Sequence, residues 1–254
     1  MNTASEKRPL GTRWCKTGIV LAVLAMILTV IGLGGGVTGT LPPITAFMAF
    51  GIGGLLFFVS MLASIVGLAL SKGSAGDASA ALTLVTLAAG VVVISGALTQ
   101  MPETSGAPAI HDLTTDLNDP PAFVAIAALR ADAPNPPEYL DDGTDELQKA
   151  AFPDLVTQTI DMPTPQVFAA AEQAVIDLGW ELVAADMLDG RIEATDTTYW
   201  FGFKDDVVIR IVGDDTATWI DVRSKSRVGK GDMGTNARRI RVFLATLAEK
   251  TGGA

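Results

Sequence analysis

Three long runs of uncharged, mostly apolar residues fill most of the first hundred positions. They cover Thr17–Thr40, Leu41–Ser71 and Ala78–Met101. Each exceeds the roughly 20 residues that a helix needs to cross a bilayer. The pattern predicts three transmembrane helices, placed near Gly18–Gly35, Ile44–Leu70 and Ala80–Thr99.

The basic residues that flank these runs predict their orientation. Several basic residues lie just before the first run, whereas the first basic residue after the third run is Arg130, about 30 positions further along the chain. Because basic residues collect on the cytoplasmic side, we expect residues 1–17 to be a cytoplasmic tail, residues 18–100 to form the membrane region, and the remainder to be extracytoplasmic. A cleaved signal peptide is the competing interpretation of the first helix, but its apolar region is long and lacks an A-x-A-like cleavage site. Four basic residues precede the first helix: Lys7, Arg8, Arg13 and Lys16.

The composition of the three spans favours an anchor over a transporter. None contains Asp, Glu, Lys, Arg or His, the groups that ion and proton pathways normally need. Small residues recur four positions apart, which suits close packing between the helices. Such pairs are Gly32/Gly36, Gly35/Gly39 and Ser60/Ser64.

The second half begins irregularly and then alternates strand and helix patterns. Residues 101–153 are rich in Pro and Asp, whereas residues 154–250 predict an α+β domain. One helix is expected at Pro165–Leu178, and a second follows Asp232, its expected N-cap. The predicted strands are Leu155–Ile160, Trp180–Ala185, Arg191–Thr197, Tyr199–Phe203, Val207–Val212 and Ala217–Arg227.

Turn-rich links between these strands favour antiparallel pairing. The expected fold is an antiparallel sheet of about five strands with two helices on one face. A more curved, helix-grip-like sheet around the last helix is the alternative. In the last strand, Ser224 and Ser226 share one face, while Arg223, Lys225 and Arg227 share the other.

Charge and composition exclude several classes of function. From Gln100 onward the chain carries 13 Lys+Arg and 26 Asp+Glu, a net charge of −13, which would repel nucleic acid. The single cysteine, Cys15, lies in the basic tail, and His111 is the only histidine. A zinc site made from Cys and His is therefore excluded within one chain, and we expect no cofactor.

Several motifs of the second half resemble one family. They are G-R-I-E-A-T (Gly190–Thr195), F-G-F-K-D-D-V-V-I-R (Phe201–Arg210) and D-V-R-S-K-S-R-V-G-K-G-D-M-G-T-N-A-R-R-I (Asp221–Ile240), with I-H-D-L-T-T-D upstream. The chain from about Pro108 to Lys250 resembles the bacterial and plastid family catalogued as domain of unknown function 1499. The three-helix leader resembles the arrangement in some bacterial members. The family has no assigned activity, so the resemblance implies no catalytic residues.

The stretch from Arg223 to Asn236 has the local chemistry of an anion site. Guanidinium groups, hydroxyls and a helix N-terminus come together in this stretch, and they suit a phosphate or carboxylate. The competing interpretation is structural: the serines fill the sheet edge, the arginines pair with the abundant aspartates, and Lys225 is solvated. The candidate ligand-binding residues are Arg223, Ser224, Ser226, Arg227, Gly229 and Asn236.

Two weaker candidates involve the only histidine. His111, Asp112 and Asp116, with Asp119, could offer ligands to a hard cation, but they lack the glycine turn and terminal Glu of an EF-hand loop. Ordinary turn chemistry is the favoured explanation, so no metal site is predicted. A hydrolase would have to use His111 with nearby carboxylates, and G-x-S-x-G is absent.

These observations together predict a multi-pass protein of a bacterial inner (plasma) membrane. Its N-terminus would be cytoplasmic and its C-terminal domain periplasmic or otherwise extracytoplasmic. We expect the bilayer and an anionic lipid, envelope component or partner protein as its partners, and an interaction role over catalysis. The alternative is an envelope hydrolase acting through His111.

Overall fold

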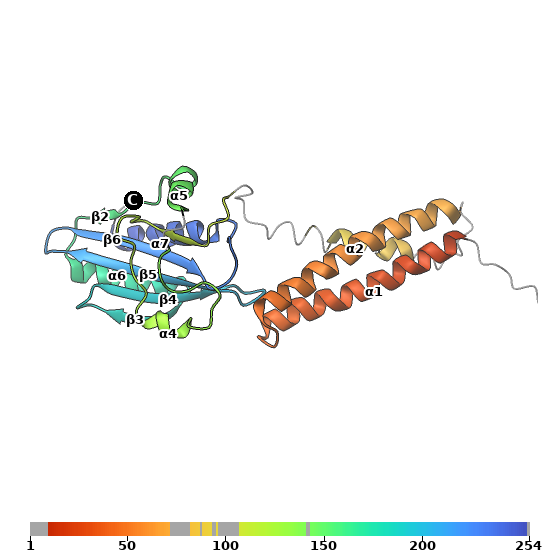
Figure 1. The fold of residues 1–254 in the computed structure, drawn as a ribbon, viewed down its shortest axis with the longest axis horizontal. Helices are drawn as coiled ribbons and strands as arrows, with labels where there is room; N and C mark the ends of the chain where they lie inside the picture. The colour runs from red at the N-terminus through yellow and green to blue at the C-terminus, as the bar shows by residue number, and fades with distance from the viewer. Residues whose placement is uncertain are drawn as a thin grey trace, which may run out of the picture. The chain divides into compact units, whose positions relative to one another are not determined.

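The computed structural model describes residues 10–71, 82–86, 88–92, 95, 107–140 and 143–252. These residues fall into two compact units, which are described separately. One unit is built from apolar helices and also includes Tyr199–Gly202, and the other is an α+β domain (Figure 1).

Two helices of the first unit are long and apolar enough to cross a membrane. They are α1 (Leu10–Val37) and α2 (Pro43–Ser71), of 28 and 29 residues. In the third apolar run, the described residues form a shorter apolar helix, Leu82–Val92, and apart from Ser95 the rest of the predicted span lies outside the described residues. The described chain thus supports two candidate spans and not the predicted three. Helix α1 also begins eight residues before the predicted Gly18.

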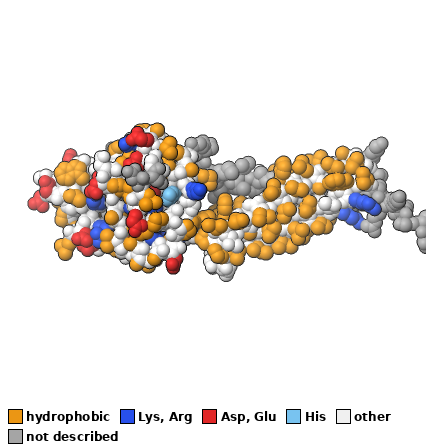
Figure 2. All heavy atoms as spheres, in the orientation of Figure 1, with side chains coloured by type: hydrophobic (Ala, Val, Ile, Leu, Met, Phe, Trp, Pro, Cys, Tyr) orange, Lys and Arg blue, Asp and Glu red, His pale blue; other side chains and the backbone are white. Residues whose placement is uncertain are grey.

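Small residues let α1 and α2 pack closely. A Cβ atom added at Gly18 would come within 2.3 Å of Ser64 Oγ, and one at Gly53 within 2.5 Å of Thr29 Oγ1. Ser60 Oγ donates a hydrogen bond to the Gly18 carbonyl at 2.8 Å. Large apolar side chains cover the outer surface of the pair, as expected for helices in lipid (Figure 2).

The α+β domain contains one antiparallel sheet of six strands, in the order β1-β6-β5-β4-β3, with β2 also paired to β6. The predicted strand Tyr199–Phe203 is wrong, because these residues form the turn between β4 and β5 and the strand resumes at Lys204. Strand β1 lies inside the segment predicted to be irregular. The strands are β1 (Asp112–Thr114), β2 (Gln158–Ile160), β3 (Glu181–Asp186), β4 (Arg191–Thr197), β5 (Lys204–Gly213) and β6 (Thr218–Ser226).

Two helices cover one face of this sheet, as predicted (Figure 1). They are α6 (Thr164–Asp177) and α7 (Thr235–Lys250), and they enclose an apolar core. The other face is covered by residues 115–140, which we call the strap and which contain the short helix α4 (Ala125–Leu129). Helix α5 (Asp145–Ala151) follows the strap. Core residues include Val167, Val175, Trp180, Ile209, Ile220, Ile240 and Phe243.

The start of α7 differs slightly from the prediction. Its N-cap is Gly234, with φ of 81°, and not Asp232. The Asp232 carboxylate nevertheless accepts hydrogen bonds from the backbone N–H groups of Gly234 at 2.8 Å and Asn236 at 2.5 Å. Asp232 therefore accepts hydrogen bonds from N–H groups at the start of α7, although it lies two residues before the N-cap.

We predict that residues 107–252 fold without the helical unit. The buried cluster that forms the main core draws all its residues from Ile110 onward, so no membrane helix is needed to complete it. A fragment with these bounds should be soluble without detergent and should unfold cooperatively in urea, followed by circular dichroism. Aggregation of this fragment, and of fragments that start earlier, would contradict the prediction.

Candidate functional site

The sheet face under the strap is lined with charged side chains. Because the strand pleat alternates, Arg223 and Lys225 of β6 point to this face together with Asp206 of β5. Strand pairing sets Lys225 opposite Asp206, and Asp206 opposite Thr195 of β4. Arg227 follows directly after β6 and reaches the same face. The sequence thus brings cations and carboxylates of three strands together beneath one segment.

One half of this cluster centres on Asp112, at the start of β1. Arg223 binds its carboxylate with two parallel hydrogen bonds, Nε to Oδ1 and Nη2 to Oδ2, both at 2.8 Å. Lys225 Nζ lies 3.0 Å from the same Oδ2 atom. Both cationic side chains are 1% exposed. The Arg223 guanidinium also stacks over the rings of Phe123 and Tyr139, with centroids at 4.9 and 5.1 Å.

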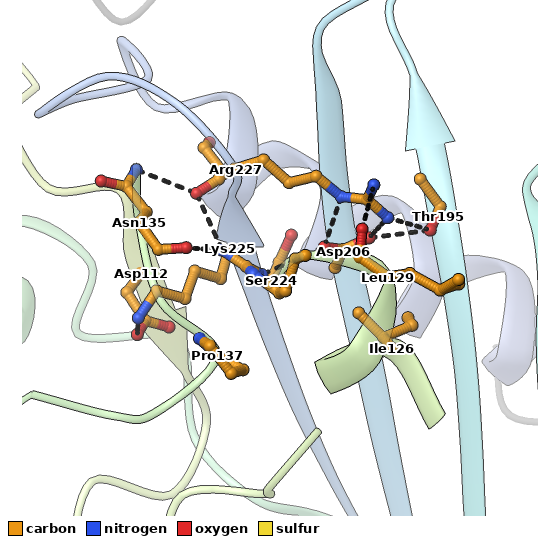
Figure 3. Close-up of polar contacts among 12 residues, drawn as sticks. Asp112, Ile126, Leu129, Asn135, Pro137, Thr195, Asp206, Ser224, Lys225 and Arg227 are labelled. Atoms are coloured by element: carbon orange, nitrogen blue, oxygen red, sulfur yellow. Dashed lines mark hydrogen bonds and ion pairs between the residues drawn. The ribbon is translucent and has the colours of Figure 1, made fainter. Parts of the chain in front are cut away.

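The other half centres on Asp206 (Figure 3). Arg227 binds its carboxylate through Nε at 2.9 Å and Nη2 at 2.8 Å, and Arg130 of the strap adds Nη1 at 3.1 Å. Thr195 Oγ1 donates to Asp206 Oδ1 at 2.7 Å. Asp206 and Arg130 have fully buried side chains.

These two halves place four cations around two carboxylates, and backbone carbonyls accept further hydrogen bonds from the cations, although the buried Nε of Arg130 has no hydrogen-bond partner. Burial lowers the pKa of Lys225 and of Arg130, while nearby Asp112 and Asp206 respectively oppose that shift. The positive charge that the carboxylates leave uncompensated is met by carbonyl dipoles, most of them in the strap. The accepting carbonyls are those of Pro121, Leu129, Asn135, Pro137, Glu138 and Ser226.

The remaining candidate residues lie elsewhere. Ser224, Ser226 and Asn236 are on the opposite, helix-covered face, where Ser224 Oγ donates to Asn236 Oδ1 at 2.7 Å and Asn236 Nδ2 donates to Ser226 Oγ at 3.0 Å. Arg239 completes this network and pairs with Asp205. The Gly229 carbonyl accepts from the Asn135 side chain at 2.9 Å.

The six predicted anion-site residues are therefore divided between two faces of the sheet. Each is bonded to another part of the domain. An anion at Arg223 or Arg227 would have to replace a carboxylate or a carbonyl that is already bound. Lys225, expected to be solvated, is buried because Asp112, far away in the sequence, supplies its counter-charge.

The sequence did not reveal the structural roles of two polar residues, one that fixes the strap and one that fixes the sheet edge. The buried Glu193 carboxylate accepts hydrogen bonds from the backbone N–H groups of Val124, Ala125 and Ile126, where α4 starts. Gln148 of α5 pairs with both backbone groups of Thr114, as a neighbouring strand would. Glu193 lies in the G-R-I-E-A-T motif, but no local pattern marks Gln148.

The residues around His111 leave little space. His111, Asp112, Tyr139 and Lys225 line a cavity of about 10 Å³, which has room for about one water molecule. Burial and the nearby Asp145 raise the pKa of Tyr139. Asp116 lies apart and pairs with Arg210 at 2.8 Å. Within the described ranges no three His, Cys, Asp or Glu side chains are arranged to hold a metal ion.

A larger concavity lies beside the strap. This groove has a volume of about 470 Å³, within the size range of ligand sites. One wall is the start of the strap and the other is α5 with the chain that leads into β2. Its lining residues are Thr115, Asp116, Leu117, Asn118, Gln148, Lys149, Phe152, Pro153, Leu155, Val156 and Thr157.

We predict that Arg223 stabilises the fold, and Arg241 provides a matched control. Arg241 binds Asp154 with the same two-bond geometry, but its side chain is 40% exposed. Arg223→Ala should lower the free energy of unfolding by about 3–5 kcal/mol, because it leaves Asp112 buried with less counter-charge. Arg241→Ala should cost about 0–1 kcal/mol. Urea denaturation measures both.

A result opposite to this would favour the anion site. In that case Arg223→Ala would keep the parent stability and lose ligand binding. Arg223→Lys adds a finer test, since it retains the charge and loses the planar fork, and it should restore only part of the stability.

The comparisons with known proteins agree with the motif resemblance. A family model described as a protein of unknown function, DUF1499, matches residues 112–247, which run from the first residue of β1 into α7. No curated protein and no solved structure matches the chain. Because the family match covers more than half of the 254 residues, the chain belongs to the DUF1499 family.

Proposed function

We propose that this protein is a membrane-anchored binding module of the bacterial inner membrane. Its N-terminus is cytoplasmic, and its α+β domain is extracytoplasmic and binds an envelope component or a partner protein. The apolar helices α1 and α2, with a third span at Ala80–Thr99, are the anchor. Support for the anchor comes from the length of α1 and α2 and from the lack of charge between Thr17 and Thr40 and between Leu41 and Ser71.

The observation that carries the binding role is the groove of about 470 Å³. Apolar side chains such as Leu117 and Val156 line it together with polar ones such as Asn118 and Lys149, the mixture that ligand sites use for affinity and orientation. Such a lining suits an amphipathic segment of a partner protein. We therefore favour the partner-protein branch of the expected function over an anion held at Arg223 and Arg227.

The cationic cluster contributes to this role by ordering the strap. Arg223, which is held by Asp112, donates to the Pro121 carbonyl just after the first residues of the strap, and Thr115 of the groove wall donates to Asp221 of β6. The opposite wall is joined to β1 through Gln148 and Thr114. Both walls are thus fixed before a ligand arrives, which lowers the entropic cost of binding.

The geometry supports binding more than hydrolysis. The cavity beside His111 holds about one water and leaves no room for a substrate. The groove lining contains no His, Cys or Ser that could act as a nucleophile or its base. Its only carboxylate, Asp116, is engaged by Arg210, and its pKa lies below the usual value despite partial burial, because N–H groups of Asp119 and Asn118 and the Arg210 guanidinium stabilise the charged form.

We predict that a reporter active only outside the cytoplasm works when fused after Ala254. The physical reason is the bias of basic residues toward the N-terminal side of α1. The matched fusion at the N-terminus should be inactive. A C-terminal fusion that is stably expressed but silent would reverse the orientation.

We also predict that a photo-crosslinking residue at Val156 captures a partner in intact cells. Val156 lines the groove and is 52% exposed; Ile176 lies outside it on α6 and is 51% exposed, so it controls for random capture. Position 156 should give a discrete adduct that position 176 does not give, and mass spectrometry should identify it. The adduct should also fall when Lys149→Glu alters the groove rim. Equal labelling at positions 156 and 176 would contradict the assignment of the groove as the binding site.

A further inference from the structure

The turn between β4 and β5 carries consecutive aromatic residues. Tyr199 is 72% exposed and Trp200 is 43% exposed. Two hydrogen bonds close the turn, from Thr198 N–H to the Phe203 carbonyl at 2.8 Å and from Phe203 N–H to Thr198 Oγ1 at 2.9 Å, and Gly202 adopts a φ of 70°. The aromatic side chains are therefore presented by a closed hairpin.

No charged residue occurs from residue 197 to residue 203, in a half of the chain with a net charge of −13. Exposed Trp and Tyr rings pair an apolar body with a polar atom, and this chemistry places them at the boundary between a bilayer and water. The opposite end of the sheet also exposes apolar side chains, with Leu188 at 98% and Trp219 at 46%, but Asp189, Asp214 and Asp215 lie close to them in the sequence, whereas the aromatic turn itself carries no charge.

The chain enters the domain at the same end of the sheet. Ser226 donates its N–H to the His111 carbonyl, and Arg227 donates its N–H to the carbonyl of Lys204, the first residue after the aromatic turn. Gly231 packs so closely on Ala109 that an added Cβ would lie 2.8 Å from the Ala109 Cα. The start of the domain and the aromatic turn are thus neighbours at one end.

The two ends of the sheet differ in charge. Near the aromatic turn lie two exposed cations, Lys204 and Lys230, and one exposed carboxylate, Glu181 at the start of β3. The opposite end carries the acidic β3–β4 and β5–β6 turns, with exposed Asp189, Asp214 and Asp215. Anionic lipid would attract the first end and repel the second.

We infer that the β4–β5 turn docks into the bilayer interface, so that the aromatic end of the sheet faces the membrane and the acidic end points away. This inference rests on the proposed membrane anchoring. Tyr199 and Trp200 enter the headgroup region, while Lys204 and Lys230 contact anionic headgroups. The groove of the domain then has a fixed orientation relative to the bilayer surface.

Trp200 and Trp219 allow a matched test. Trp219 is 46% exposed and pairs with Val212 near the acidic end. Strand β5 has ten residues, so the two tryptophans are separated by roughly 30 Å along the sheet at about 3.3 Å per residue. Trp14 of α1 reports on the anchor itself, and Trp180, buried in the core, is kept throughout as a constant background.

The experiment uses the full chain in bilayers of phosphatidylglycerol and brominated phosphatidylcholine. Three variants each retain Trp180 and one of Trp14, Trp200 or Trp219, with Phe at the other positions; each must match the parent's circular dichroism. Bromine on the acyl chains quenches tryptophan only at short range. Trp14 and Trp200 should lose fluorescence relative to bilayers without bromine, and Trp219 should not.

The other outcomes separate the two proposals. Quenching of Trp14 without quenching of Trp200 leaves the anchor intact and overturns the docking of the turn. Equal quenching of Trp200 and Trp219 also overturns it, because the domain would then lie flat on the lipid. Absence of quenching at Trp14 overturns the membrane anchoring itself.

Discussion

The interaction on which the α+β domain most depends is the pairing of Asp112 with Arg223 and Lys225. It joins the first residue of β1 to β6, 111 residues further along the chain. Removing two cations from water costs several kcal/mol each, and only a close counter-charge and satisfied hydrogen bonds recover that cost. The folded sheet therefore requires β1 to sit at the edge of β6. Since the strap follows directly from β1, the same pairing fixes where the strap begins to cross the sheet.

The period-two pattern of β6 allowed part of this arrangement to be predicted. It correctly put Arg223 and Lys225 on one face and the serines on the other, and the apolar stripes of α6 and α7 gave the helical layer. The three-residue strand β1 is too short to show a period, so it was assigned to irregular chain. The aromatic run at Tyr199 has high strand propensity, yet Gly202 and the closing hydrogen bonds make it a turn.

Burial and counter-charges were less predictable than local structure, for a physical reason. Whether Lys225 is solvated depends on Asp112 and on a strap carbonyl, neither of which is near it in sequence. Likewise, Gln148 acts as a substitute strand only because the middle of α5 packs beside Thr114. A cluster of arginines and serines in sequence resembles an anion site, but the pleat directs the two residue types to opposite sides of the sheet.

The composition of the strap explains why cations hold it to the sheet, in addition to the small apolar cluster that Phe123 and Ile126 form with Val208 of β5. Five prolines lie between residues 115 and 140, at positions 120, 121, 134, 136 and 137. Proline has a carbonyl but no N–H, so such a segment has more acceptors than donors and cannot satisfy them within itself. The sheet face beneath must then supply donors, and Arg223, Lys225 and Arg227 offer many in a small area. Replacing these cations with apolar residues would bury carbonyls without partners, so the strap and the basic face are complementary surfaces of one fold.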